Sequence, residues 1–92
     1  MRLDLFLKSS RLVPRRSVAK HLCEIGGILV NDLPVKASKE IKAGDRIEIK
    51  RGERNTIVRV LALPAVKQVS KSAASTLFEV LSNQRHTDPL LP

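Results

Sequence analysis

Residues 2–20 read RLDLFLKSSRLVPRRSVAK, and this stretch decides the fold. Apolar residues recur at helical spacing on both sides of Pro14, first at Leu3, Phe6 and Leu7 and then at Val18, Leu22 and Ile25. The pattern predicts two short helices, each with one apolar stripe. Arg16 and Lys20 are four residues apart, so they should share a face of the second helix, away from its stripe.

The same stretch is strongly basic. It holds one acid, Asp4, and six cations: Arg2, Lys8, Arg11, Arg15, Arg16 and Lys20. Arg15 and Arg16 follow Pro14, which suits the first turn of a helix. The N–H groups of a first turn and two forked guanidinium groups together form a receptor for phosphate. A solvated basic face is the alternative for any one of these residues, but their number favours phosphate binding.

The whole chain is basic as well. It has 92 residues, of which 42% are hydrophobic, and a formal net charge of +8. This length fits one small domain, and the charge favours a polyanionic partner, nucleic acid first and an anionic membrane surface second. Lys8 interrupts the N-terminal apolar run, so we expect neither a signal peptide nor a membrane span. The single cysteine, Cys23, excludes an internal disulfide and is compatible with a reducing cytoplasm.

Beyond the two helices, the sequence predicts a small antiparallel sheet. Gly26 and Gly27 should end the second helix, and turns are expected at Asn31-Asp32 and at residues 52–55. Short β-prone runs predict strands at residues 28–30, 33–35, 46–50 and 56–61. The predicted fold class is therefore α+β, with two N-terminal helices packed on a small antiparallel sheet.

The last third of the chain begins at Pro64. Residues 67–72 are typical of a linker, and residues 86–92 of a disordered tail. Between them, residues 73–83 predict a short C-terminal helix whose inward face holds Ala74, Leu77, Phe78 and Leu81. We therefore expect a nucleic-acid-binding domain over residues 1–63, and a linker, short helix and tail over residues 64–92.

Catalytic side chains are almost absent. His21 and Cys23 are two residues apart, which places them on different sides of a helix, so neither a nucleophile pair nor shared metal ligation follows. We expect no enzyme, no cofactor and no metal site. The only aromatic residues, Phe6 and Phe78, lie on apolar stripes, which favours folded RNA over single strands whose bases stack on aromatic rings.

Four motifs in order resemble a known family. They are R-L-D-x-F-L-K-x-S-R-L at residues 2–12, R-R-S-x-A-K at 15–20, G-x-I-x-V-N at 26–31 and K-A-S-x-x-I-K-x-G-D at 36–45. The chain resembles the S-four-type, or αL, RNA-binding domain. Within that family it is most similar to stand-alone bacterial factors, which are the RqcP-like P-site tRNA-stabilising factors of ribosome-associated quality control and the related heat shock protein of fifteen kilodaltons.

The resemblance implies an activity that the residues alone do not. It implies binding to the rRNA of large ribosomal subunits that carry peptidyl-tRNA in the P site, in the cytoplasm. An RqcH-type elongation partner would add C-terminal alanines there, and the chain would be a monomer off the ribosome. Asp4 would position a nearby arginine. The implied RNA-facing set is Arg2, Asp4, Lys8, Arg11, Arg15, Arg16 and Lys20, to which we add Lys36 and Lys39.

Two departures and three alternatives accompany this reading. Leu5 stands where the family often has a cation, and Asp32 replaces a common turn glycine. A heat-shock ribosome-rescue factor that binds dissociated large subunits with a nascent chain is one alternative. An RNA-targeting module of a modification enzyme is a second, and a peripheral membrane protein that uses the basic helices is a third.

Overall fold

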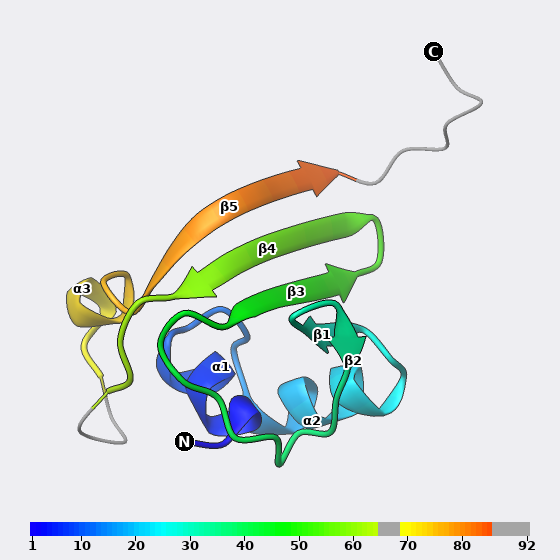
Figure 1. Ribbon diagram of the computed structural model, residues 1–92, viewed down its shortest axis with the longest axis horizontal. Coiled ribbons are helices and arrows are strands. Elements are labelled where there is room, and N and C mark those ends of the chain that lie inside the picture. The colour runs from blue at the N-terminus through cyan, green and yellow to red at the C-terminus, as the bar shows by residue number, and fades with distance from the viewer. Residues whose placement is uncertain (65–68, 86–92) are drawn as a thin grey trace.

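The computed structural model describes residues 1–64 and 69–85 and has two layers. One layer holds the helices α1 (Leu3–Ser9) and α2 (Arg16–Glu24), which cover one face of a five-stranded antiparallel sheet (Figure 1). The sheet order is β2-β1-β3-β4-β5. The strands are β1 (Ile28–Val30), β2 (Leu33–Pro34), β3 (Arg46–Arg51), β4 (Arg54–Val60) and β5 (Phe78–Arg85). The predicted α+β class, with two N-terminal helices on an antiparallel sheet, is confirmed.

The two helices bury their apolar stripes against the sheet. On α1, the side chains of Leu3, Phe6 and Leu7 have no exposed surface. On α2, Ala19 and Leu22 are buried, but Ile25 is 63% exposed, so the predicted stripe is wrong at its last position. The reason is that α2 ends at Glu24, and the chain then reverses through Gly26, which has a φ of +76°.

Gly27 allows the end of α2 to pack closely on the sheet. Its amide donates to the Leu22 carbonyl at 2.7 Å, and its own carbonyl accepts from the Lys50 amide at 2.7 Å. A Cβ at this position would lie only 3.0 Å from the Lys50 carbonyl oxygen. The pair Gly26 and Gly27 therefore ends the helix, as predicted, and also admits the backbone of β3.

The strands follow the predicted alternation. On β3, Ile47 and Ile49 face the helices and are buried, and Val58 and Val60 on β4 complete this core. Asn31 and Asp32 link β1 to β2 with φ angles of 52° and 70°, as a type I′ hairpin requires. The edge strand β2 has only two residues, because Pro34 cannot continue a ladder of hydrogen bonds.

Side-chain hydrogen bonds of Asn31 and Asp45 hold the loop that leads into β3. Asn31 donates from Nδ2 to Asp45 Oδ1 at 3.2 Å, and Asn31 Oδ1 accepts from the Arg46 amide at 3.0 Å. The second oxygen of Asp45 accepts from the Lys42 amide at 2.9 Å. This buried carboxylate therefore joins the β1–β2 hairpin to the loop that carries Lys36 and Lys39.

The predicted helix over residues 73–83 is wrong. A helix α3 spans only Lys71–Ala74, and β5 takes the chain from Phe78 along the free edge of β4. Ala74 and Leu77 are buried as expected, but Leu81 is 41% exposed. An isolated helix of this length is only marginally stable, whereas pairing with β4 joins the segment to a sheet that is already formed, so tertiary context overrides the helical period.

The C-terminal segment therefore extends the sheet of the N-terminal part. Phe78 lies opposite Val60, and Glu79 lies opposite Arg59. The predicted tail, residues 86–92, and residues 65–68, which include the start of the predicted linker, lie outside the described residues. The division of the chain after residue 63 stays a prediction.

Candidate nucleic-acid interface

A buried carboxylate joins the starts of the two N-terminal helices. Asp4, in the first turn of α1, has a side chain that is only 2% exposed. Its Oδ2 accepts from Arg16 Nε at 3.1 Å and from Arg2 Nη2 at 3.4 Å, and Arg2 Nε lies 3.4 Å from Oδ1. One acid thus orients two arginines that are fourteen positions apart in the sequence.

Both arginines remain available to a ligand. The side chains of Arg2 and Arg16 are 45% and 48% exposed. A guanidinium group has five N–H donors, and Asp4 uses the Nε of Arg16 and leaves its two Nη groups to other acceptors. A half-buried guanidinium held by a carboxylate is a preorganised donor for a phosphate oxygen.

The chain start is also paired with the loop before β3, and this brings two lysines close. The Leu3 amide donates to the Lys39 carbonyl at 2.8 Å, and the Asp4 amide donates to the Ala37 carbonyl at 3.1 Å. Arg2 and Glu40 form an isolated antiparallel bridge. Lys36 and Lys39 are both exposed on this loop, so they lie beside the start of α1.

A hollow of about 480 Å³ opens between α2 and this loop. We call it the helical hollow. It is lined by Arg2, Lys20, Cys23, Glu24, Lys36, Ala37 and Ser38. Three cations and one acid therefore share a concave surface. The three cations come from the chain start, from α2 and from the loop before β3, which only the fold brings together.

Cys23 lies in the helical hollow but is not a nucleophile. Burial raises the pKa of its thiol above the ordinary value, and the nearby carboxylates of Asp4 and Glu24 raise that pKa further. The thiol is therefore protonated at neutral pH, and only a thiolate is reactive. His21 is exposed on α2, and no group of three or more metal-ligating side chains exists within residues 1–64 and 69–85.

Three further predicted residues lie outside the lining of the helical hollow. Lys8 is exposed in the last turn of α1, and Arg15 is the exposed N-cap of α2, which begins at Arg16. Arg11 has a φ of 61° and donates from Nη2 to the Val69 carbonyl at 3.3 Å, so part of its role is to hold the C-terminal segment. All three extend the basic surface around the link between the helices.

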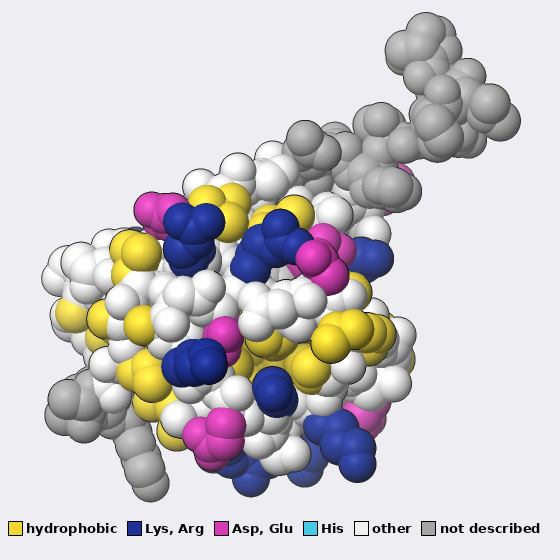
Figure 2. All heavy atoms as spheres, viewed as in Figure 1, with side chains coloured by type: hydrophobic (Ala, Val, Ile, Leu, Met, Phe, Trp, Pro, Cys, Tyr) yellow, Lys and Arg dark blue, Asp and Glu magenta, His cyan; other side chains and the backbone are white. Residues whose placement is uncertain are grey.

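The opposite face of the sheet carries cations too, but acids neutralise them. We call this the sheet face; its charged residues are Arg46, Glu48, Lys50, Arg59 and Glu79. Lys50 Nζ lies 3.5 Å from Glu48 Oε2, Arg59 Nη1 lies 3.5 Å from Glu79 Oε1, and Arg46 pairs with Asp32. Figure 2 shows basic atoms beside acidic ones over the upper strands, and several basic atoms along the lower edge, where acidic atoms also lie.

We call the surface formed by α1, α2 and the loop before β3 the helical side. Few of its cations have an acidic partner. No ion pair among the described residues includes Lys8, Arg11, Arg15, Lys20, Lys36 or Lys39. Sequence reasoning found the cations, but it did not find that Asp4 is buried and holds both Arg2 and Arg16. No spacing signal shows this, because Asp4 and Arg16 meet only when the helices pack.

No helix in the described part of the chain is long and apolar enough to cross a membrane.

Comparison with known protein families adds a finding that does not depend on this geometry. The S4 domain model matches residues 1–47.

Several relatives are named "RQC P-site tRNA stabilizing factor". The protein from Halalkalibacterium halodurans is 45% identical over 87% of this chain and 89% of its own length. The one from Helicobacter pylori (strain 26695) is 41% identical over 77% of this chain and 84% of its own length.

Two solved structures share the fold. The solution structure of a hypothetical protein has a TM-score of 0.77 and 34% identity, and it covers 91% of this chain and 100% of that one. The trimeric structure of Vibrio cholerae heat shock protein 15 has a TM-score of 0.79 and 24% identity over 87% of this chain and 80% of that one. The second likeness concerns the fold alone.

Proposed function

This chain belongs to the S4-domain family of RQC P-site tRNA stabilizing factors, and from this membership we propose that it binds the large ribosomal subunit and stabilises peptidyl-tRNA in the P site. The family is one of non-enzymatic factors. The observation that carries the proposal is the buried Asp4, which holds Arg2 and Arg16 ready on a side of the molecule with excess positive charge.

The helical side supplies a mechanism for such binding. Guanidinium and ammonium groups replace the counterions of RNA phosphates, and this release drives association. Arg2, Lys20 and Lys36, which line the helical hollow, would form the centre of the contact together with Arg16, which shares Asp4 with Arg2. Lys8, Arg11, Arg15 and Lys39 would extend it, and Asp4 would position arginines without touching phosphate.

Shape and backbone contacts fit folded RNA better than exposed bases. Phe6 is fully buried in the core, and Phe78 packs against that core, so neither ring offers a stacking platform for a base. The cations therefore act on phosphates, as in proteins that recognise RNA helices by shape. Both rRNA and the body of a tRNA offer such surfaces.

The proposal extends to partners and setting, and here it rests on the family. We propose that the chain acts in the cytoplasm on split large subunits, beside an RqcH-type partner that elongates the stalled nascent chain with alanines. Off the ribosome it would be a monomer. Pull-down of the tagged chain from cells under translational stress, followed by sizing of the free protein, tests both points.

A heat-shock rescue role is the second candidate, and one observation favours it. The chain is 30% identical over 68% of its length to a heat shock protein 15 homolog of Haemophilus influenzae, but it covers only 48% of that protein. The stabilizing-factor relatives match along almost their whole length, so the first candidate is the stronger.

Co-sedimentation tests the proposed function. The chain is mixed with free large subunits that carry peptidyl-tRNA, with vacant large subunits and with intact ribosomes. We expect it to pellet best with the tRNA-carrying subunits. Equal recovery with vacant subunits would contradict the proposed stabilisation of peptidyl-tRNA, and a chain left in the supernatant in all three mixtures would contradict both candidates.

A further inference from the structure

A second pair of arginines lies at the tip of the β3–β4 hairpin. Arg51 and Arg54 are directly opposite each other in the register, joined by Gly52 and Glu53, and Gly52 has the positive φ of 56° that this tight turn requires. Like charges directly opposite each other on paired strands are destabilising. Such an arrangement is unfavourable unless an anion joins it.

Neither arginine is held by a carboxylate in the described part of the chain, although Glu53 lies in the turn between them. Neither Arg51 nor Arg54 takes part in an ion pair there, although both are exposed. In contrast, Lys50 and Arg59 of the same two strands each have a carboxylate partner at 3.5 Å. Within the described residues, the sheet therefore leaves the two guanidinium groups at this tip outside any ion pair and pairs the cations at neighbouring positions.

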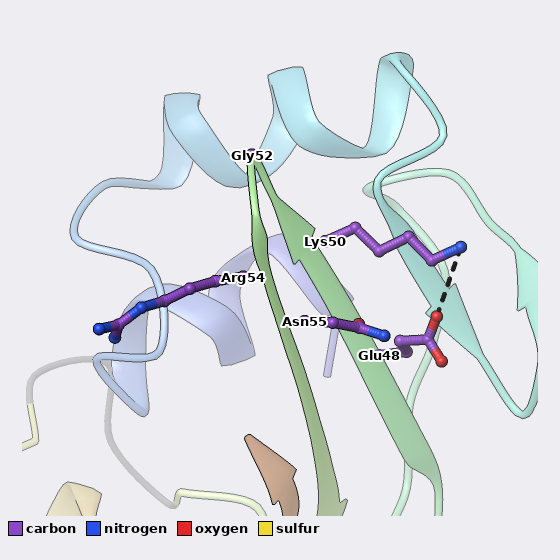
Figure 3. Close-up of a pocket in the computed structure, with 5 residues that line it drawn as sticks. All are labelled: Glu48, Lys50, Gly52, Arg54 and Asn55. Carbon is purple, nitrogen blue, oxygen red and sulfur yellow. Dashed lines mark ion pairs between the residues drawn. The ribbon is translucent and has the colours of Figure 1, made fainter. Parts of the chain in front are cut away.

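The two arginines share a concave surface with the helical layer. A hollow of about 340 Å³ is lined by Leu12, Ile49, Arg51, Arg54 and Thr56. Leu12 belongs to the link between α1 and α2, which also carries Arg11 and Arg15. Arg54 also lines a smaller hollow at the hairpin with Glu48, Lys50, Gly52 and Asn55, and Figure 3 shows its side chain extended away from Lys50 and Asn55.

We propose that Arg51 and Arg54 form a second RNA phosphate site, separate from the helical hollow. No residue lines both the helical hollow and the hollow that Arg51 and Arg54 share, and the new site is built from the hairpin and the α1–α2 link instead of α2 and the loop before β3. Two planar guanidinium groups over one concavity suit the oxygens of a backbone phosphate. The inference rests on the proposed function and adds to it a second point of contact, so that the chain holds RNA at two places.

The double variant Arg51→Gln/Arg54→Gln tests the site. Glutamine keeps a long polar side chain and removes the charge. The matched control is Lys50→Gln/Arg59→Gln, which removes the same charge from the same strands at neutralised positions. Binding of each full chain is measured on tRNA-carrying and on vacant large subunits, as a function of salt, and thermal unfolding of each is recorded.

We expect the hairpin variant to lose two phosphate contacts. The slope of its log affinity against log salt should be shallower than that of the wild type by roughly 1.4 to 1.8. When the salt is raised from about 50 to about 200 mM, the affinity of the variant should therefore fall by a factor that is roughly ten-fold smaller than for the wild type. The control should keep the wild-type slope. The hairpin variant should unfold at no lower temperature than the wild type, because it relieves a repulsion.

The outcomes separate this inference from the proposed function. A change confined to tRNA-carrying subunits assigns the phosphate to tRNA, and a change on both kinds of subunit assigns it to rRNA; each supports the site. A wild-type chain that binds subunits, with a hairpin variant of equal affinity and slope, overturns the site alone. Equal losses in the variant and the control would overturn it too, because only overall charge would then matter. Failure of the wild type to bind would instead remove the proposed function.

Discussion

The helical side and the sheet face use the same residue types, and they differ in where the acids stand. On the helical side, Asp4 is buried beneath Arg2 and Arg16 and leaves both about half exposed. On the sheet face, Glu48 and Glu79 lie beside their cations, and Glu79 is itself 46% exposed. A buried acid orients cations and leaves their outer donors free, whereas an acid at the surface cancels their field.

This difference explains how a small basic protein can present one binding side. Its net charge of +8 would attract RNA to any surface if it were evenly spread. The neutralised sheet face limits that attraction, and the uncompensated cations of the helical side give it a direction. We therefore predict that the arrangement of acids, and not the count of lysines and arginines, decides which side faces RNA.

Asp4→Asn should change the helical side most. The amide keeps the shape of the side chain but removes the charge that holds Arg2 and Arg16. We expect the free energy of unfolding to fall by about 1 to 3 kcal/mol, because buried hydrogen bonds to a charged group are lost. Affinity for tRNA-carrying large subunits should also fall, although the net charge rises by one. Urea unfolding and subunit binding measure the two effects.

The matched control is Asp32→Asn, which removes an acid that is 72% exposed and pairs with Arg46. Its cost should be at most about 1 kcal/mol. Stronger RNA binding by the Asp4 variant would mean that charge alone, without orientation, governs the contact.

Arg16→Ala should have the second-largest effect on RNA binding. If about five phosphates are neutralised, log affinity of the wild type falls with log salt at a slope of roughly −3.5 to −4.5. Loss of Arg16 should weaken binding to all RNA sequences alike and make this slope shallower by about one. Salt titration of subunit binding measures it. Lys50→Ala removes a neutralised cation and should leave the slope unchanged; a salt-insensitive wild type would contradict the mechanism.

The double variant Glu48→Gln/Glu79→Gln should erase the contrast between the two sides. It frees Lys50 and Arg59 from their acids, so the sheet face becomes cationic. We expect a modest gain in affinity for unrelated double-stranded RNA and a change in stability within about 1 kcal/mol. Electrophoretic mobility shifts at low salt detect the gain. An unchanged affinity would show that the shape of the sheet face, and not its neutralisation, keeps RNA away.

The smallest expected effect concerns the pH dependence of the chain start. A hydrogen bond from the N-terminal ammonium, 2.8 Å from Glu40 Oε2, lowers the pKa of this carboxyl below its ordinary value of 4.5. Because the pKa of Glu40 is lowered in the folded chain, the ion pair stabilises the fold fully above pH 4.5. This stabilisation is lost as the pH falls through the folded-state pKa. Glu40→Gln should remove this small acid sensitivity. Urea midpoints above about pH 5 and below about pH 4 compare the two chains; identical pH profiles would show that the pair contributes nothing.

The sequence predicted the elements whose signals are local. The periods of Leu3, Phe6 and Leu7, the alternation around Ile47 and the turn at Asn31 each act over a few residues, and the structure confirms them. The predicted helix over residues 73–83 is wrong, because their apolar spacing suits a helix, while the edge of β4 with which they pair exists only after the sheet has formed.

The candidate site divides in the same way. Its cations could be found by composition and by family motifs, and their role in RNA binding stays a prediction. The burial of Asp4 and the hollow shared by Arg2, Lys20 and Lys36 depend on how α1, α2 and the loop before β3 pack. The neutralisation of Arg59 could not be predicted either, because Glu79 had been placed in a helix and not opposite Arg59 in the sheet.

The orientation of the chain on a large subunit that carries peptidyl-tRNA tests the central claim most directly. Electron cryo-microscopy of that complex should place RNA phosphates against Arg2, Arg16, Lys20 and Lys36, with the sheet face turned toward solvent. A map in which Lys50 and Arg59 contact RNA while the helical hollow faces solvent would contradict the account.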